Sequence, residues 1–223
     1  MKNPHEELNT VIHDSLRRDL GRLGAAVSTP MTDERRTVLC SHATWVLDVL
    51  HHHHVGEDEG VWPLVLSKRP DLQPLMDQME TEHDELATAS DRLRQALSRY
   101  AADGSEPARQ AVVAAVQDMM SATLSHLEHE ERETMPLVLD TLDAGDWKYL
   151  EKNHFRKGVA FGEAGMTAMW WLDGLDEDRR WVVQKTIPKP VLWFMGRRFG
   201  PRYRRNCHIA WGTAWAMSRA GWP

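Results

Sequence analysis

Two copies of one histidine and glutamate pattern in this chain could bind transition-metal ions. Each copy has a histidine, then about forty residues later a second histidine with a glutamate four residues after it. The six residues are His13, His53 and Glu57 in the first copy and His83, His126 and Glu130 in the second. Because residues four apart lie on one face of an α-helix, each His–Glu pair can present an imidazole and a carboxylate to the same point. Imidazole with carboxylate favours iron, manganese or zinc over calcium or magnesium, which prefer all-oxygen shells.

The flanking residues indicate that the two copies are an internal repeat. The letters HDSL at His13 recur as HDEL at His83, and PLVL begins six residues after each glutamate, at Pro63 and Pro136. A single HxxxE is usually incidental on an acidic helix, but two in matching order argue for a shared role. The period near 70 residues is too long for a small solenoid repeat and indicates a helix pair duplicated into a four-helix bundle. Six side chains cannot fill the coordination of two roughly octahedral ions, so the open positions imply chemistry or ligand binding.

Helical periodicity predicts four long helices and almost no strand. Their approximate ranges are 5–23, 32–67, 71–101 and 107–143. Pro63 and Pro136 fall inside two of these patterns, so each is expected to kink its helix or end the regular part, one to two turns beyond the metal-binding face. The sequence therefore predicts an all-α fold, with a four-helix bundle and a di-metal centre within residues 1–146.

Four consecutive histidines, His51–His54, precede Glu57 in the first copy. Successive helix residues point about 100° apart, so at most two of the four can face one site. The repeat selects His53 and assigns His52 and His54 to supporting or surface positions. His129 in the second copy is also assigned a supporting role. The sequence leaves open whether His129 or His52 is a fifth imidazole ligand.

The composition of the chain changes at residue 147. Residues 1–146 hold 13 Lys and Arg against 27 Asp and Glu, whereas residues 147–223 hold 14 against 6, with eight of the ten tryptophans. This second segment is predicted to be a basic, Trp-rich helical extension, with one helix over 147–172 and short pieces between the prolines and glycines beyond it. So much aromatic area favours packing on the bundle or on a partner subunit, as in a homodimer, over contact with membrane or nucleic acid.

The remaining features favour a cytoplasmic protein. The two cysteines, Cys40 and Cys207, are too few for a disulfide framework and point to a reducing compartment. No basic and apolar leader opens the sequence, and no apolar run is long enough for a transmembrane segment. The net charge of −6 and the lack of a nucleic-acid motif argue against a nucleic-acid partner.

The order H, HxxxE, H, HxxxE, with a proline ten residues after each HxxxE histidine, resembles the bacterial hemerythrin-like (HHE cation-binding) family over about residues 5–143. The resemblance implies an up-down-up-down bundle that holds two iron ions joined by an oxo or hydroxo bridge and binds oxygen, peroxide or nitric oxide. Oxygen-carrying members have a second histidine one turn away on the third helix, where this chain has Met79 and Ala87. They also have an aspartate five residues after the fourth-helix histidine, where this chain has Glu131. These departures favour bacterial relatives connected with peroxide, nitric oxide or iron handling.

Three functions are compatible with such a centre. The first is a redox enzyme that disproportionates or reduces a small oxidant, as a peroxidase, a catalase-like enzyme or a nitric oxide-detoxifying oxidoreductase. The second is a protein that binds or senses oxygen, nitric oxide or iron without turnover. The third is a di-iron oxygenase acting on an organic substrate. The sequence favours reaction with a small oxidant, open coordination positions support either of the first two functions, and turnover with peroxide would separate them.

Overall fold

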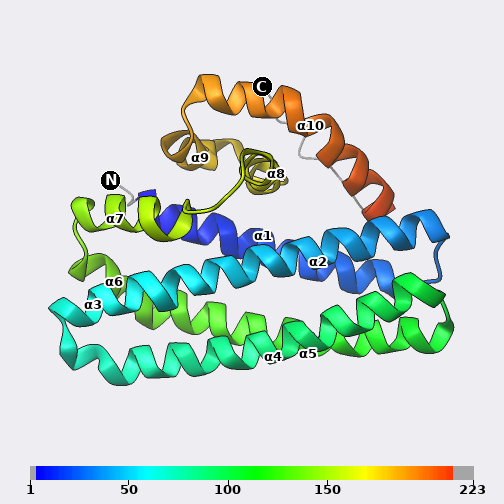
Figure 1. Cartoon of the computed structure of the whole chain (residues 1–223), viewed down its shortest axis with the longest axis horizontal. Helices are drawn as coiled ribbons and strands as arrows, with labels where there is room; N and C mark the ends of the chain where they lie inside the picture. Colours follow the sequence, from blue (N-terminus) through cyan, green and yellow to red (C-terminus); the bar gives the residue numbers. More distant parts are fainter. Residues whose placement is uncertain (1–3, 213–223) are drawn as a thin grey trace. The chain divides into compact units, whose positions relative to one another are not determined.

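The structure is a computed structural model that describes residues 4–212, so Trp215 and Trp222 of the predicted extension lie outside the described residues. Those described residues form helices and contain no strand, which confirms the predicted all-α class of a helical bundle. The up-down-up-down order stays a prediction. The elements, shown in Figure 1, are α1 (Pro4–Val27), α2 (Asp33–Gly56), η1 (Glu57–Val61), α3 (Trp62–Lys68), η2 (Pro70–Leu72), α4 (Gln73–Asp103), α5 (Glu106–His129), η3 (Glu130–Thr134), α6 (Met135–Thr141), α7 (Ala144–Leu150), η4 (Glu151–Phe155), α8 (Phe161–Leu172), η5 (Glu177–Arg179), α9 (Arg180–Thr186) and α10 (Lys189–Trp211).

The chain divides into two compact units, which we describe separately. The first unit comprises Met1–Ala43 with Val159–Pro223, and the second comprises Thr44–Gly158. The packing boundary near residue 158 does not follow the change in composition, since Trp147 and Leu150 belong to the hydrophobic core of the second unit. None of the helices within residues 4–212 is long and apolar enough to cross a membrane.

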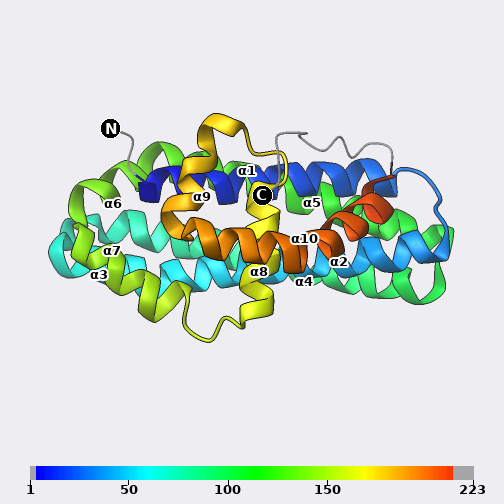
Figure 2. The same cartoon turned by 90° about the horizontal axis from the view of Figure 1, so that it is seen from above.

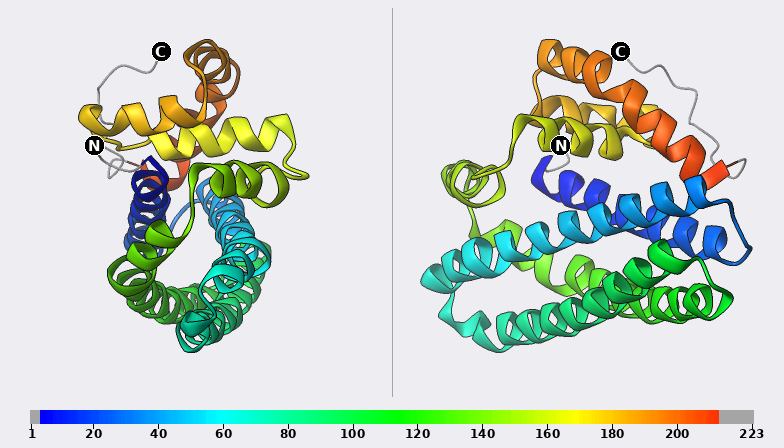
Figure 3. Two further views of the ribbon diagram at one scale, coloured as in Figure 1. Left: turned by 90° about the vertical axis from the view of Figure 1, so that its left-hand side faces the viewer. Right: turned by 45° about the vertical axis from the view of Figure 1, so that its right-hand side comes forward.

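Helices α4 and α5 are neighbours in the second unit and run side by side (Figures 1 and 3). The turn between them is short because both helix ends are capped locally. Gly104 adopts a left-handed conformation (φ 64°) that ends α4, and its N–H donates to the carbonyl of Tyr100 at 3.0 Å. Ser105 then caps α5 by accepting a hydrogen bond from the N–H of Ala108 at 3.3 Å. Two helices joined in this way must lie antiparallel.

Both HxxxE pairs end in a π-helical segment, which the sequence analysis did not predict. The segments η1 and η3 are five residues long and begin at Glu57 and Glu130, respectively. Such wider turns are rare in proteins overall, and those that do occur are often found at functional sites. Pro63 and Pro136 lie in the first turn of the next helices, α3 and α6, where a missing N–H is tolerated. The regular helix is therefore interrupted at the glutamate, six residues before the proline.

A hydrophobic core lies next to these π-helical segments in the second unit. Trp62, Met76 and Met79 are fully buried in it. The other buried members are Val61, Val65, Leu72, Met135, Val138, Leu142, Trp147 and Leu150. This core joins η1, α3, α4 and α6 to α7, so it fixes η1 and the helix that follows η3 against the start of α4.

The first unit contains a buried polar network that joins α1 to the carboxy-terminal helices. Asp19 accepts hydrogen bonds from Arg18 (2.8 Å), Trp170 (3.0 Å) and His42, whose Nε2 lies 3.0 Å from the carboxylate. Asp173 pairs with Arg22 at 2.6 Å and accepts a hydrogen bond from Tyr203 at 3.1 Å. Both carboxylates are buried, and each has a cationic partner, as buried charges require.

Two sequence-based expectations for the extension were wrong. The predicted helix over 147–172 is interrupted, because Gly158 has a positive φ of 79° between η4 and α8. The expected short pieces after Pro188 are instead one 23-residue helix, α10, with Pro201 inside it. Helix α10 bends along its length (Figure 1) and crosses α8 (Figure 2). The close approach depends on Gly165, because a Cβ there would lie 2.1 Å from the ring of Phe199.

Candidate metal centre

Imidazole groups from α2, α4 and α5 meet the carboxylates that begin the π-helical segments η1 and η3 in the second unit. Nε2 of His53 lies 3.3 Å from one oxygen of Glu57, and the other oxygen of Glu57 lies 3.8 Å from Nε2 of His83. Nε2 of His126 lies 3.6 Å from the carboxylate of Glu130. All five side chains are buried. The structure therefore brings these five residues of the repeat close to one another within the second unit.

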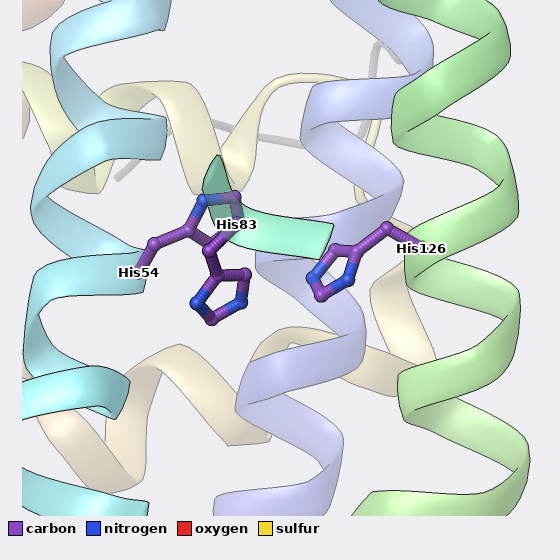
Figure 4. A group of neighbouring side chains, drawn as sticks. All are labelled: His54, His83 and His126. Carbon is purple, nitrogen blue, oxygen red and sulfur yellow. The ribbon is translucent and has the colours of Figure 1, made fainter. Parts of the chain in front are cut away.

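A further imidazole, that of His54, belongs to the same cluster. Its ring stacks on the ring of His83, with centroids 4.0 Å apart and an angle of 9° between the planes. It also lies edge-on to the ring of His126, with the two centroids 5.2 Å apart. One ring nitrogen from each of the three lies within 4.8 Å of the others. Figure 4 shows the three imidazoles directed toward one another from three helices.

Two acidic side chains fix the orientation of His83 and His126. Nδ1 of His83 lies 2.6 Å from Asp58, and Nδ1 of His126 lies 3.1 Å from Glu82. Because an ionised carboxylate can only accept, each Nδ1–H donates and leaves the lone pair on Nε2. In metal sites this arrangement selects the tautomer that coordinates through Nε2 and makes the imidazole more basic.

The electrostatics of the cluster favour a bound cation. Burial raises the pKa of Glu57 well above its usual range, and the neighbouring charges of Glu130 and Asp58 raise it further. Burial also lowers the pKa of His126, against the opposing effect of Glu130, so the ring favours the neutral form that binds metal.

Three buried atoms of the cluster make no hydrogen bond within the described structure. They are Oε2 of Glu57 and the Nε2 atoms of His83 and His126. A buried polar atom without a partner costs about 1–3 kcal/mol. All three are metal-ligating atoms on neighbouring side chains, so the residues present fit a metal ion.

The remaining histidines that the sequence singled out are His13, His52 and His129. His13 is buried on α1 in the first unit, and its assignment as a ligand continues to rest on the repeat. Nε2 of His52 lies 2.9 Å from the carbonyl oxygen of Phe155. Nδ1 of His129 lies 2.8 Å from Glu82, the carboxylate that also holds His126. The supporting roles that the sequence suggested for His52 and His129 stay predictions.

The sequence analysis assigned His54 a supporting or surface position, and the structure buries its side chain within this cluster. Matching the two copies residue by residue selects His53 and gives no reason to choose its neighbour. The only signal was the run of four histidines itself, since a 100° step between neighbours permits two of them to reach adjacent points.

Comparison with protein families gives one result. The model described as the hemerythrin HHE cation binding domain matches residues 7–138. Comparisons with curated proteins and with solved structures gave no match. The matched region is more than half of the chain and contains both HxxxE pairs and the clustered histidines. The chain therefore belongs to the hemerythrin HHE cation-binding family of metal-binding proteins, whose cation is typically iron.

Proposed function

We propose that this chain is a non-haem di-iron protein that reacts with a small oxidant, namely hydrogen peroxide, nitric oxide or dioxygen. The proposed ligands are the six residues of the repeat: His13, His53, Glu57, His83, His126 and Glu130. The observation that carries the proposal is the group of buried Nε2 and carboxylate oxygen atoms on Glu57, His83 and His126, which have no hydrogen-bond partner in the described structure.

The donor set supports iron as the metal. Imidazole nitrogens mixed with carboxylate oxygens suit iron, manganese and zinc, whereas hard cations prefer oxygen alone. Two carboxylates from opposite halves of the repeat, Glu57 and Glu130, would help to hold two divalent ions and would offset part of their charge. Bound iron would supply both electrons and Lewis acidity to the reaction.

The burial of the site supports a small reactant over an organic substrate. His83 is 4 %, His126 2 % and Glu130 0 % exposed. A diatomic molecule or peroxide can reach such a centre through small fluctuations, while a larger substrate needs an open cavity. The buried surroundings also exclude bulk water, which strengthens the electrostatic effect of every charged group in the site.

The side chains of this protein have separate tasks in that function. Asp58 and Glu82 hold the ligand imidazoles in one tautomer. Trp62 supports Asp58 by donating a hydrogen bond from Nε1 at 3.1 Å. Thr134, in the π-helical segment η3, donates to the sulfur of buried Met79 at 3.2 Å, which ties η3 to α4. These contacts keep the ligands oriented before metal binding.

Metal analysis together with spectroscopy and kinetics tests the proposal. We expect about two iron ions per chain and near-ultraviolet absorption from the iron centre. Added peroxide or nitric oxide should be consumed at a rate proportional to protein concentration. A stable adduct without consumption would show a binding protein instead. Purified protein that takes up no iron under anaerobic reconstitution would contradict the proposal.

Single alanine variants locate the site within that experiment. We expect His53→Ala, Glu57→Ala, His126→Ala and His13→Ala to lower bound iron strongly. His208 is exposed on α10, so His208→Ala serves as the matched control and should keep the iron content of the parent protein. Equal iron in all five variants would show that the ligands lie elsewhere.

A further inference from the structure

We propose that His54 is a ligand of the same metal ion as His83 and His126. This inference rests on the proposed function and adds a residue that the repeat does not predict. It also makes the two ions chemically different, because one of them is then bound by three imidazoles from three helices of the second unit.

The position of the His54 ring supports ligation. The side chain of His54 is only 6 % exposed. A histidine on the surface of an acidic helix would instead be solvated. Its plane is nearly parallel to that of His83, and both rings approach His126 at a steep angle, 78° and 70°. One ring nitrogen of each of the three histidines lies within 4.8 Å of the other two (Figure 4).

The hydrogen bonds of the neighbouring rings give an independent argument. His83 and His126 each use Nδ1 for a carboxylate, and their Nε2 atoms are buried without a hydrogen-bond partner in the described structure. Two lone pairs directed at each other repel, and a third imidazole placed beside them adds to that cost. A shared metal ion turns the same three lone pairs into bonds, because neutral imidazole is a common metal ligand.

The geometry of α2 explains how neighbouring residues serve two ions. His53 and His54 point about 100° apart around the helix, and their ring centroids are 5.7 Å apart. His53 lies beside Glu57, at 3.3 Å, whereas His54 lies against His83 and His126. Two ions in a di-metal site are about 3.5–4 Å apart. Adjacent positions on α2 can therefore serve two neighbouring ions.

Iron stoichiometry tests the role of His54, with a histidine of the same run as control. We would reconstitute wild type, His54→Gln and His51→Gln with ferrous iron alone and titrate each with a competing chelator. His51 is exposed on the same helix, so its variant makes the same chemical change away from the cluster. We expect His54→Gln to bind one of its irons at least about tenfold more weakly, while His51→Gln matches wild type. Two irons of unchanged affinity in His54→Gln would overturn the inference.

Two further measurements keep the result interpretable. His54→Leu preserves the packing volume, so it shows whether iron loss follows from the missing nitrogen when the glutamine variant folds poorly; circular dichroism of the apo-proteins reports folding. Mössbauer spectra of wild type loaded with ⁵⁷Fe need no variant at all. We expect two distinct doublets of equal area, and one symmetric doublet would overturn the inference. Wild type that binds no iron would instead contradict the proposed function itself.

Discussion

Nδ1 of His83 lies 2.6 Å from an oxygen of Asp58, the residue that follows the metal-site glutamate in the first copy of the repeat. The same oxygen accepts a hydrogen bond from Nε1 of Trp62. Asp58 therefore connects the π-helical segment η1 to α4 and to the start of α3. Its side chain is one third exposed, so it holds the ring of His83 from the edge of the buried cluster.

We predict that Asp58→Ala lowers iron affinity by about 10- to 100-fold, the range found for groups that hold metal-ligating histidines. Asp58→Asn keeps an acceptor oxygen, so its loss should be smaller. Glu59 is an exposed acid in the same segment, and Glu59→Ala is the matched control. Chelator competition with ferrous iron measures all three. If the aspartate variants bound iron as tightly as the control, Asp58 would have no part in orienting His83.

A second prediction concerns Gly56, the last residue of α2 before Glu57. A Cβ at this position would lie 2.4 Å from the ring of Phe155 in η4. We expect Gly56→Ala to cost about 1–3 kcal/mol of stability through overpacking. At Gly21 nothing lies within 4 Å of a Cβ, so Gly21→Ala should stabilise its helix by about 0.5–1 kcal/mol. The free energy of unfolding in urea should thus fall for Gly56→Ala and rise for Gly21→Ala. A stabilised Gly56→Ala would show that the ring of Phe155 in η4 can move aside at little cost.

Much of the candidate site could be predicted from the sequence because both copies of the repeat carry the same residue types at matching positions. His53 and Glu57 correspond to His126 and Glu130, and only a shared role explains matching types at matching positions. His54 could not be predicted in that way, since it has no counterpart in the second copy. Its role depends on the direction of one side chain relative to α4 and α5, which spacing along the chain does not determine.

The extension shows the corresponding limit for the fold. Pro201 and the nearby glycines were read as helix breakers, yet α10 continues through them. Tertiary packing outweighed local propensity there, because Phe199 contacts Gly165 of α8 and Tyr203 is fully buried. The gain from burying such large side chains exceeds the cost of one proline within a helix.

A third prediction follows from the buried carboxylate of Asp19. Although burial raises its pKa, the charge of Arg18 and the contact with His42 outweigh this and hold the pKa below its usual range. The folded pKa is thus lower than the unfolded value of about 3.9, so the stabilising contribution is complete above that value and is lost as the pH falls through the folded pKa. We expect Asp19→Asn to cost about 3–5 kcal/mol at neutral pH, and the difference from wild type to shrink below about pH 4.

Urea unfolding between pH 7 and pH 2 measures that difference, with Asp71→Asn as the control. Asp71 pairs with Arg69 on the surface of the second unit, where an ion pair contributes little. A stability difference between Asp19→Asn and wild type that stayed constant across the acid range would show that Asp19 is not ionised in the folded protein.

The last prediction concerns the segment after Gly158, which supplies α8, α9 and α10 to the first unit. Trp170 is fully buried and donates to Asp19, and Asp173 accepts from Arg22. Ending the chain after Gly158 removes both contacts and exposes the apolar face of α1. Loss of a buried tryptophan alone costs about 3–5 kcal/mol, and each kcal/mol lowers Tm by about 2–4 °C in a chain of this size.

We therefore expect the shortened chain to melt roughly 10 °C lower and to bind a hydrophobic dye, while every proposed iron ligand remains in place. A chain ending at Gly212 keeps all of the contacts named here and is the matched control. Differential scanning calorimetry and dye fluorescence of the two proteins provide the comparison. If the shorter chain were as stable and as soluble as the control, residues 159–212 would be an independent module rather than part of the first unit. Their basic surface on α10 would then be the place to look for a partner.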